Sequence, residues 1–294
     1  MINVNNLTLK YRNGKGVFNL NFEVKQGEVI GYLGPNGAGK TTTIRALLGF
    51  IKADEGSASI DGMDTFDDAP EIMKNLGYLP GEITFLDGMT GEEYLNYLAE
   101  VRGIKDRTRE KELIQMFEFS PKGSIKKYSK GMKQKLGIVA AFMHDPDVYI
   151  LDEPTSGLDP LMQNRFVELI KSEKERGKTI LMSSHMFEEV ERTCDHVLII
   201  KDGHLVAHAD IETLKNSQRK GYELKTTNNT QALELFTELG YEVDNVNDVV
   251  EVYVTGEQVD KFIKACSMLH VISLDIKAQT LEDVFMHYYA RGNK

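Results

Sequence analysis

The order of three segments constrains the fold of this chain more than any other feature. A continuous apolar run, GEVIGYLG at 27–34, leads directly into the glycine-rich sequence GPNGAGKT at 34–41. Far downstream, the sequence YSKGMKQKL begins at Tyr128, and VYILDEPTSGLD follows at 148–159. A short, continuous apolar run bounded by turn residues is typical of a buried parallel strand. The order therefore predicts two buried strands, each of which ends at a polar loop.

The glycine-rich segment has the complete pattern of a phosphate-binding loop, with an apolar strand before it and a helix after it. Its glycines allow a tight turn in which successive N–H groups point at phosphate oxygens, and the helix start adds a favourable dipole. Lys40 would reach the β- and γ-phosphates, and the Thr41 hydroxyl would bind Mg²⁺. The residues expected to bind the nucleotide are Gly34, Asn36, Gly37, Ala38, Gly39, Lys40, Thr41 and Thr42.

Two carboxylates, Asp152 and Glu153, end the apolar run at 148–151. A carboxylate at the end of a strand beside a phosphate loop holds Mg²⁺, directly or through water, and a second one deprotonates an attacking water. We assign the first role to Asp152 and the second to Glu153. An Asp-Glu pair before proline is also a common strand-to-turn boundary, so this assignment depends on the phosphate loop.

The composition excludes several classes of protein. The net charge of −10 argues against a chain whose main partner is a nucleic-acid backbone, because phosphate neutralisation needs clustered Lys and Arg. Cys194 and Cys266 lie far apart without metal-ligand spacing, which predicts two reduced thiols. The first residues lack the pattern of a secretory signal. The longest apolar run, at 136–143, is too short to span a bilayer.

The remaining pattern predicts two domains. Strands alternate with helices over most of residues 1–214, which favours a mainly parallel sheet with helices on both faces. Apolar–polar alternation near the N-terminus predicts an antiparallel part, and an inserted helical lobe is expected at about 85–145, where Thr90 and Glu93 form a capping box. Residues 221–294 read as β-α-β-β-α-β, the ferredoxin-like order of an α+β domain, followed by a last helix at 280–290.

The ordered motifs over residues 1 to about 210 resemble those of the ATP-binding cassette (ABC) ATPases. The resemblance implies the α/β P-loop NTPase cassette fold and the cofactors ATP and Mg²⁺. It also implies a catalytic group of Glu153, Lys40 and His185, in which His185 contacts the γ-phosphate. A lone histidine after a strand is otherwise more often structural.

The resemblance assigns further residues to the nucleotide. Tyr11 matches the aromatic residue that stacks on adenine, although it could be an ordinary strand aromatic. Ser129 and Gly131 match the signature turn that closes over the γ-phosphate of the opposite subunit, where a helix start would face an anion. Asp159 matches the loop that links the two sites of a dimer, although Pro160 after it makes a helix N-cap an alternative.

Two positions depart from the family pattern. The family commonly has two adjacent glycines after the serine, and Lys130 fills the first of these places, where it would lie near the phosphate or point into solvent. Gly81 and Glu82 stand where the family usually has a glutamine that senses Mg²⁺ and the membrane subunit. Glu82 would supply a metal ligand from a shifted position, beside Thr41 and Asp152, or the loop would serve only as a docking surface.

The tail TLEDVFMHYY at 280–289 resembles the C-terminal extension of exporter-type cassettes. Its apolar stripe favours packing on its own domain, with dimer contacts or regulation as secondary roles.

The resemblance implies an ATP-hydrolysing subunit of an ABC transporter of the exporter type. Its expected partners are a second ATP-binding subunit, as a homodimer or heterodimer, and a multi-span membrane permease, with no nucleic acid. The expected location is the cytoplasmic face of the cell membrane. The alternative is a soluble ABC ATPase acting on ribosomes or DNA, but such proteins usually carry two cassettes or a long coiled-coil insertion, and neither pattern occurs here.

Overall fold

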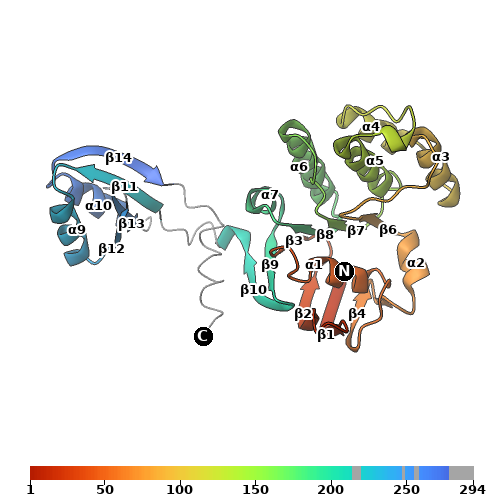
Figure 1. Cartoon of the computed structure of the whole chain (residues 1–294), viewed down its shortest axis with the longest axis horizontal. Helices are drawn as coiled ribbons and strands as arrows, with labels where there is room; N and C mark the ends of the chain where they lie inside the picture. Colours follow the sequence, from red (N-terminus) through yellow and green to blue (C-terminus); the bar gives the residue numbers. More distant parts are fainter. Residues whose placement is uncertain (214–219, 247–248, 255–257, 278–294) are drawn as a thin grey trace. The chain divides into compact units, whose positions relative to one another are not determined.

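The computed structural model describes residues 1–213, 220–246, 249–254 and 258–277. The chain falls into two compact units, Met1–Ile211 with two sheets and Glu212–Lys294 with one (Figure 1). Each unit has its own hydrophobic core. The domain bounds 1–214 and 221–294, with a helical lobe at about 85–145, remain our proposal because 214–219 lie outside the described residues.

A six-stranded sheet forms the centre of the first unit, in the order β10-β9-β3-β8-β7-β6. Its pairings are parallel except at the edge, where β10 runs antiparallel to β9. The strands are β3 (Val29–Leu33), β6 (Leu76–Leu79), β7 (Val148–Asp152), β8 (Thr179–Ser184), β9 (His196–Lys201) and β10 (His204–Asp210). The mainly parallel sheet predicted from the sequence is confirmed.

Three central strands, β3, β7 and β8, are buried along their whole length. Helices or a second sheet must cover both faces of such strands, which explains their continuous apolar sequences. Because the strands are parallel, their carboxyl ends meet at one edge of the sheet. The residues that follow Leu33, Asp152 and Ser184 therefore lie close together at that edge.

A second, antiparallel sheet packs against one face of the first unit's core. It consists of β2 (Gly16–Val24), β1 (Ile2–Lys10), β4 (Glu55–Ile60) and β5 (Met63–Asp64), in that order. One hydrophobic cluster joins Leu7 and Leu20 of this sheet to Tyr32 and Ile150 of the parallel sheet. This confirms the predicted antiparallel part.

Helices cover the two faces of the six-stranded sheet. Figure 1 shows α1 on the side of the antiparallel sheet, and α5, α6 and α7 on the other side. The helices are α1 (Lys40–Leu47), α2 (Ala69–Lys74), α3 (Gly91–Val101), α4 (Thr108–Met116), α5 (Lys130–Phe142), α6 (Pro160–Glu175) and α7 (Phe187–Thr193), with a short 3₁₀ turn at Ile125–Lys127.

The predicted helical segment between the strands consists of two helices, α3 and α4. The capping box at the start of α3 is confirmed: Glu93 N–H donates to Thr90 Oγ1 at 3.2 Å, and Thr90 N–H donates to Glu93 Oε2 at 2.8 Å. Gly103, with φ of 66°, lies between α3 and α4, and it divides a pattern that the sequence presents as one helical region.

The second unit contains one antiparallel sheet in the order β12-β13-β11-β14. Its elements are β11 (Lys220–Thr226), α9 (Asn229–Glu238), β12 (Glu242–Val246), β13 (Val249–Val254), α10 (Val259–Cys266) and β14 (Val271–Lys277). Leu224, Phe236, Val252 and Phe262 are fully buried in its core. The predicted β-α-β-β-α-β order is confirmed, whereas the predicted helix at 280–290 lies outside the described residues.

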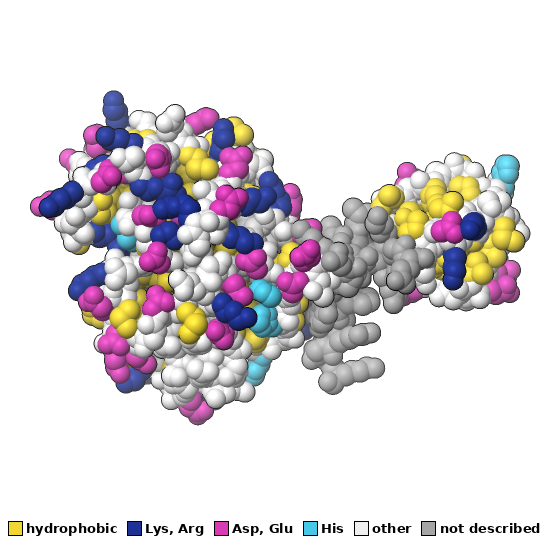
Figure 2. Space-filling model, turned by 180° about the vertical axis from the view of Figure 1, so that it is seen from behind, with side chains coloured by type: hydrophobic (Ala, Val, Ile, Leu, Met, Phe, Trp, Pro, Cys, Tyr) yellow, Lys and Arg dark blue, Asp and Glu magenta, His cyan; other side chains and the backbone are white. Residues whose placement is uncertain are grey.

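Three further findings concern membranes, thiols and charge. None of the helices in the described ranges is long and apolar enough to cross a bilayer. Cys194 and Cys266 are both buried free thiols. On the face shown in Figure 2, acidic and basic side chains are interspersed over the first unit. A surface of mixed charge signs favours solubility.

Candidate functional site

The phosphate-binding loop lies between β3 and α1, where the sequence places it. Gly37 and Gly39 have φ of 83° and 115°, a region that residues with a Cβ atom rarely adopt. A Cβ on Gly39 would lie 2.7 Å from Cγ1 of Val17, so the loop also packs closely against β2. The glycines thus allow the loop to turn sharply into the N-terminus of α1.

Lys40 is buried, with 6% of its surface exposed, at the first position of α1. Its ammonium group donates a hydrogen bond to the carbonyl of Gly34 at 2.6 Å and lies 3.6 Å from Oε1 of Glu153. A buried ammonium group needs such partners, because desolvation of an unpaired charge is costly. The loop thereby holds one positive charge at its centre.

Asp152, at the end of β7, accepts hydrogen bonds on both carboxylate oxygens. Thr41 Oγ1 donates to Oδ2 at 2.9 Å, and the hydroxyl of Ser183 donates to Oδ1. Asp152 is only 3% exposed. The structure therefore brings together Thr41 and Asp152, two of the three predicted metal ligands.

The third predicted metal ligand, Glu82, is an exposed residue. The backbone of its neighbour Gly81 passes Asp152, since a Cβ on Gly81 would lie 3.3 Å from Oδ2 of that carboxylate. Among the described residues, no hydrogen bond or ion pair joins Glu82 to Asp152 or Thr41. The loop therefore reaches the site through Gly81, while the Glu82 side chain remains at the surface.

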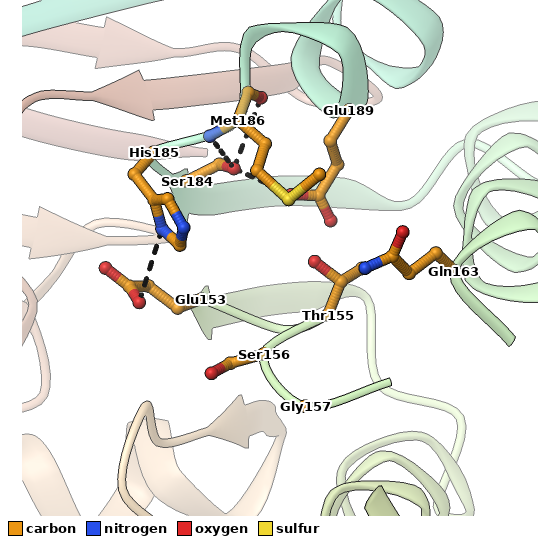
Figure 3. Close-up of a pocket in the computed structure, with 9 residues that line it drawn as sticks. All are labelled: Glu153, Thr155, Ser156, Gly157, Gln163, Ser184, His185, Met186 and Glu189. Carbon is orange, nitrogen blue, oxygen red and sulfur yellow. Dashed lines mark hydrogen bonds and ion pairs between the residues drawn. The ribbon is translucent and has the colours of Figure 1, made fainter. Parts of the chain in front are cut away.

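Glu153 lies between its two predicted catalytic partners, Lys40 and His185. Its Oε1 is 3.6 Å from the Lys40 ammonium, and its Oε2 is 3.5 Å from Nδ1 of His185. Figure 3 shows His185 and Glu153 pointing toward each other from the loops that follow β8 and β7. The backbone N–H of Glu153 donates to both the carbonyl and the hydroxyl of Ser183. The structure therefore assembles all three predicted catalytic residues, and it adds Ser183, which binds both Glu153 and Asp152.

A cavity of about 340 Å³ lies over the phosphate-binding loop. Tyr11, which follows β1, lines it together with the loop residues and Glu153, and its stacking on adenine stays a prediction. Four lining residues were not among those expected from the motifs: Asn13, Lys15, Gly16 and Pro35. Its lining residues are Tyr11, Asn13, Lys15, Gly16, Pro35, Asn36, Gly37, Gly39, Lys40, Thr41, Thr42 and Glu153. Ala38 is buried beneath the loop instead.

Ser129 and Gly131 lie at the start of α5, away from this cavity. Ser129 is the N-cap of the helix, and its hydroxyl accepts a hydrogen bond from the backbone N–H of Met132 at 3.2 Å. A Cβ on Gly131 would lie 2.9 Å from the carbonyl oxygen of Gly157, so α5 begins in contact with the loop after β7. Neither residue lines the cavity over the phosphate loop of its own chain.

Lys130 binds the loop that follows β7, a contact that neither sequence alternative included. Although the residue is exposed, its ammonium group donates to Ser156 Oγ at 2.8 Å. Its methylene groups lie over Gly157, where a Cβ would be 2.8 Å from Lys130 Cγ. Lys130 therefore connects the start of α5 to residues 156–157 of the same chain.

Asp159 is the N-cap of α6. Its Oδ1 accepts a hydrogen bond from the backbone N–H of Met162 at 3.0 Å, and Pro160 is the first residue of the helix. The structure thus confirms the N-cap alternative, which is compatible with a role at a subunit interface.

Comparisons with known proteins identify the family of this chain. The family model described as ABC transporter matches residues 17–156. The bacitracin transport ATP-binding protein BcrA of Bacillus licheniformis is 36% identical over 99% of this chain and 98% of its own length. The ABC transporter ATP-binding protein NatA of Bacillus subtilis is 37% identical over 70% of this chain and 86% of its own length.

Two solved structures share the fold. A structure of the ATP-binding subunit of an ABC transporter is 32% identical, with a TM-score of 0.68, and covers 73% of this chain and 92% of that chain. A dimeric bacterial ABC transporter cassette is 25% identical, with a TM-score of 0.64, and covers 72% of this chain and 99% of that chain. Such similarity over nearly the full length of a relative establishes the family: this chain is an ATP-binding, ATP-hydrolysing subunit of the ABC transporters.

Proposed function

We propose that Glu153 is the general base of ATP hydrolysis in this subunit. The position of its carboxylate supports this role. The carboxylate lies 3.6 Å from the Lys40 ammonium and 3.5 Å from His185, and Glu153 lines the cavity over the phosphate loop. A carboxylate there accepts the proton of the attacking water. Lys40 then neutralises charge on the β- and γ-phosphates, and His185 orients the γ-phosphate.

The residues around Asp152 fit a magnesium ion. Thr41 and Asp152 offer a hydroxyl and a carboxylate whose oxygens are 2.9 Å apart. Mg²⁺ prefers such a small set of oxygen ligands, completed by phosphates and water. Consistent with this, no group of three His, Cys, Asp or Glu residues in the described ranges forms a metal cage of its own. The ion would neutralise phosphate charge during hydrolysis. Glu82 would contribute only if its loop moved, so we assign that loop to docking.

We further propose that two such subunits form a dimer in which each completes the site of the other. Ser129 and Gly131 lie at a helix start, where backbone N–H groups and a hydroxyl favour an anion, yet they lie outside their own chain's cavity. The γ-phosphate of an opposing subunit is the ligand that this arrangement fits. The dimeric structure of a related cassette supports the same assembly.

The dimer is proposed to drive a membrane permease from the cytoplasmic face of the membrane. The transport path would lie in that permease. Export is the direction that the relatives support, because one is named for bacitracin transport and another, YbhF of Escherichia coli, for probable multidrug transport. Names of this kind also favour a transporter over an ATPase of ribosomes or DNA.

The dimer proposal is tested by the mass of the Glu153→Gln variant in solution. This variant removes the base but keeps the shape, so it should retain ATP and Mg²⁺ and run at twice the 33.2 kDa of one chain. Adding Ser129→Arg should return it to the mass of one chain, because a large side chain would block the opposing phosphate. A Glu153→Gln chain that binds ATP but keeps the mass of a monomer would contradict the composite site.

A further inference from the structure

A second cavity, of about 220 Å³, shares Glu153 and His185 with the catalytic group, but its other lining residues have no role in the chemistry described above. Four segments line it: the loop after β7, the end of β8 with the loop that follows it, helix α6 and helix α7. The lining residues are Glu153, Thr155, Ser156, Gly157, Gln163, Ser184, His185, Met186 and Glu189 (Figure 3). The loop after β7 carries Glu153, and the loop after β8 carries His185. The cavity therefore lies between two elements that must move together in hydrolysis.

Glu189 is the one carboxylate of α7 that lines this cavity, and it is only 6% exposed. Its Oε2 accepts a hydrogen bond from Ser184 Oγ at 2.7 Å. The same Ser184 hydroxyl oxygen accepts the backbone N–H of Met186 at 2.9 Å. These two hydrogen bonds link Glu189, through the Ser184 hydroxyl, to the turn at 184–186. Glu189 therefore helps to fix the backbone of His185.

The other oxygen of this carboxyl, Oε1, is buried and has no hydrogen-bond partner within the described residues. Figure 3 shows the Thr155 side chain across the cavity from it, on the loop that follows Glu153. A buried polar atom without a partner costs free energy, and such an atom is more common where a second arrangement satisfies it. The Thr155 hydroxyl lies close enough to lower the pKa of this carboxyl, and a small movement of its loop would complete a hydrogen bond to Oε1.

The electrostatic surroundings favour the protonated form of this carboxyl near neutral pH. Burial is the largest cause that raises the pKa of Glu189 to about 7. The hydroxyls of Ser184 and Thr155 lower this pKa, and the negative charge of Glu153 raises it further. The other titratable groups near it are His185, which lines the same cavity, and the buried thiol of Cys194 on the same side of the sheet. A neutral carboxyl both donates and accepts hydrogen bonds, as a bridge between two loops requires.

We propose that Glu189 is a positioning residue for ATP hydrolysis. One oxygen of its carboxyl holds the turn that carries His185, through Ser184, and the other forms a hydrogen bond with Thr155 when the loop after β7 moves closer. Glu189 does not line the cavity over the phosphate loop. It acts by setting the distance between His185 and Glu153, which lie on the two loops that it joins. This inference rests on the proposed roles of those two residues.

A double-mutant cycle on the full chain tests the inference. Glu189→Ala and Ser184→Ala should each lower kcat about tenfold, because misplacing a catalytic group by a fraction of an ångström has effects of this order. The KM for ATP should stay within about twofold, since neither residue lines the phosphate-loop cavity. The double variant should lose no more than either single variant, because both act through one contact.

Glu189→Gln should recover most of the lost kcat, since the amide keeps the shape and accepts the Ser184 hydroxyl while donating toward Thr155. The matched control is Glu188→Gln, the preceding residue on α7, whose side chain is 79% exposed. The control should keep the wild-type rate. The ratio of kcat for Glu189→Gln to wild type should also change across a midpoint near pH 7, whereas the ratio for the control should be flat.

Three results would overturn the inference: wild-type kcat in Glu189→Ala, additive losses in the double variant, or failure of Glu189→Gln to recover activity. These outcomes are distinct from failure of the proposed function. If Glu153 were not the base, Glu153→Gln itself would turn over at the wild-type rate, whatever the result at Glu189.

Discussion

At the scale of single residues, Glu153 has a backbone conformation that few residues other than glycine adopt. Its φ is 48°, in the left-handed region, and its N–H is held by both the carbonyl and the hydroxyl of Ser183. Residues in this region cost about 1–3 kcal/mol and persist where their surroundings hold them, most often at functional sites. The strained backbone aims the Glu153 carboxylate at Lys40 and His185.

Gly157 provides a test of the Lys130 contact. Its φ is 81°, and a Cβ there would lie 2.8 Å from Lys130 Cγ, so Gly157→Ala should lower the free energy of unfolding by about 1–3 kcal/mol. Lys130→Ala in the same chain removes the steric clash but not the backbone strain. It should therefore recover part of the loss, as measured by urea unfolding. Equal stability of Gly157→Ala and wild type would contradict the packing described.

The raised pKa of Glu189 predicts a pH-dependent stability. Because its pKa of about 7 exceeds the ordinary value of 4.5, the folded chain binds a proton that the unfolded chain releases between these two values. The resulting stabilisation is complete below pH 4.5 and is lost as the pH rises through 7. Glu189→Gln lacks this titration, so its stability relative to wild type should rise by up to about 3 kcal/mol from pH 4.5 to 8. Denaturant unfolding at both pH values measures this difference, and a constant difference would contradict it.

At the scale of helices and strands, one buried ion cluster joins the helical lobe to the parallel sheet. Glu173 of α6 is fully buried and binds Arg109 of α4, Arg176, and the hydroxyl of Tyr149 in β7 at 3.4 Å. Arg109 and Glu173 are 64 residues apart in sequence. This cluster fixes how α4 packs on α6.

Removing the central carboxylate should therefore be costly. Glu173→Ala removes the buried partner of Arg109 and Arg176, which keep Glu112 and Asp145, and the free energy of unfolding should fall by about 2–3 kcal/mol. Glu168→Ala, on the same helix, is the control: Glu168 is 58% exposed and pairs with Arg165 at 3.2 Å. Surface pairs contribute about 0–1 kcal/mol, so thermal unfolding should separate the two variants clearly. Similar losses in both would contradict a central role for Glu173.

The sequence predicted what is local in these elements. Continuous apolar runs such as 148–151, the glycines of the phosphate loop and the capping box of Thr90 act within a few residues, and each was found where it was expected. Contacts between distant residues left no such pattern. Nothing near Lys130 indicates Ser156, and nothing near Glu189 indicates that its side chain turns inward while that of Glu188 faces solvent. Such contacts depend on the packing of several elements at once.

The same reason explains Ser183, which holds Asp152 and Glu153 together but lies in an ordinary apolar strand sequence. Its function follows from the parallel pairing of β8 with β7, in which Asp152 and Ser183 are direct partners. The sequence does not show which strands are neighbours in the sheet, so it did not identify Ser183 as a partner of Asp152.

At the scale of the whole molecule, the two units have separate cores, and the nucleotide site lies entirely in the first. The core of the second unit contains Phe236 and Phe262, both fully buried. A unit with its own core unfolds as its own cooperative transition.

Phe262→Ala tests this independence. Loss of a buried phenylalanine costs about 3–5 kcal/mol, so one calorimetric transition of the full chain should move to lower temperature. ATP with Mg²⁺ should raise only the other transition, since ligands stabilise the unit that binds them. ATP hydrolysis below both transitions should stay at the wild-type rate. A shift of both transitions by either change would show one cooperative unit instead of two.

The central claim is that Glu153 activates water in a nucleotide site built by β3, β7 and β8. The most direct measurement is the rate of phosphate release from ATP and Mg²⁺ by wild type, Glu153→Gln and Glu23→Gln. Glu23 is an exposed carboxylate in β2, so its variant makes the same chemical change outside the site. We predict that Glu153→Gln lowers kcat by at least about 100-fold while it still binds ATP, and that Glu23→Gln matches wild type. Wild-type phosphate release by Glu153→Gln would contradict the account.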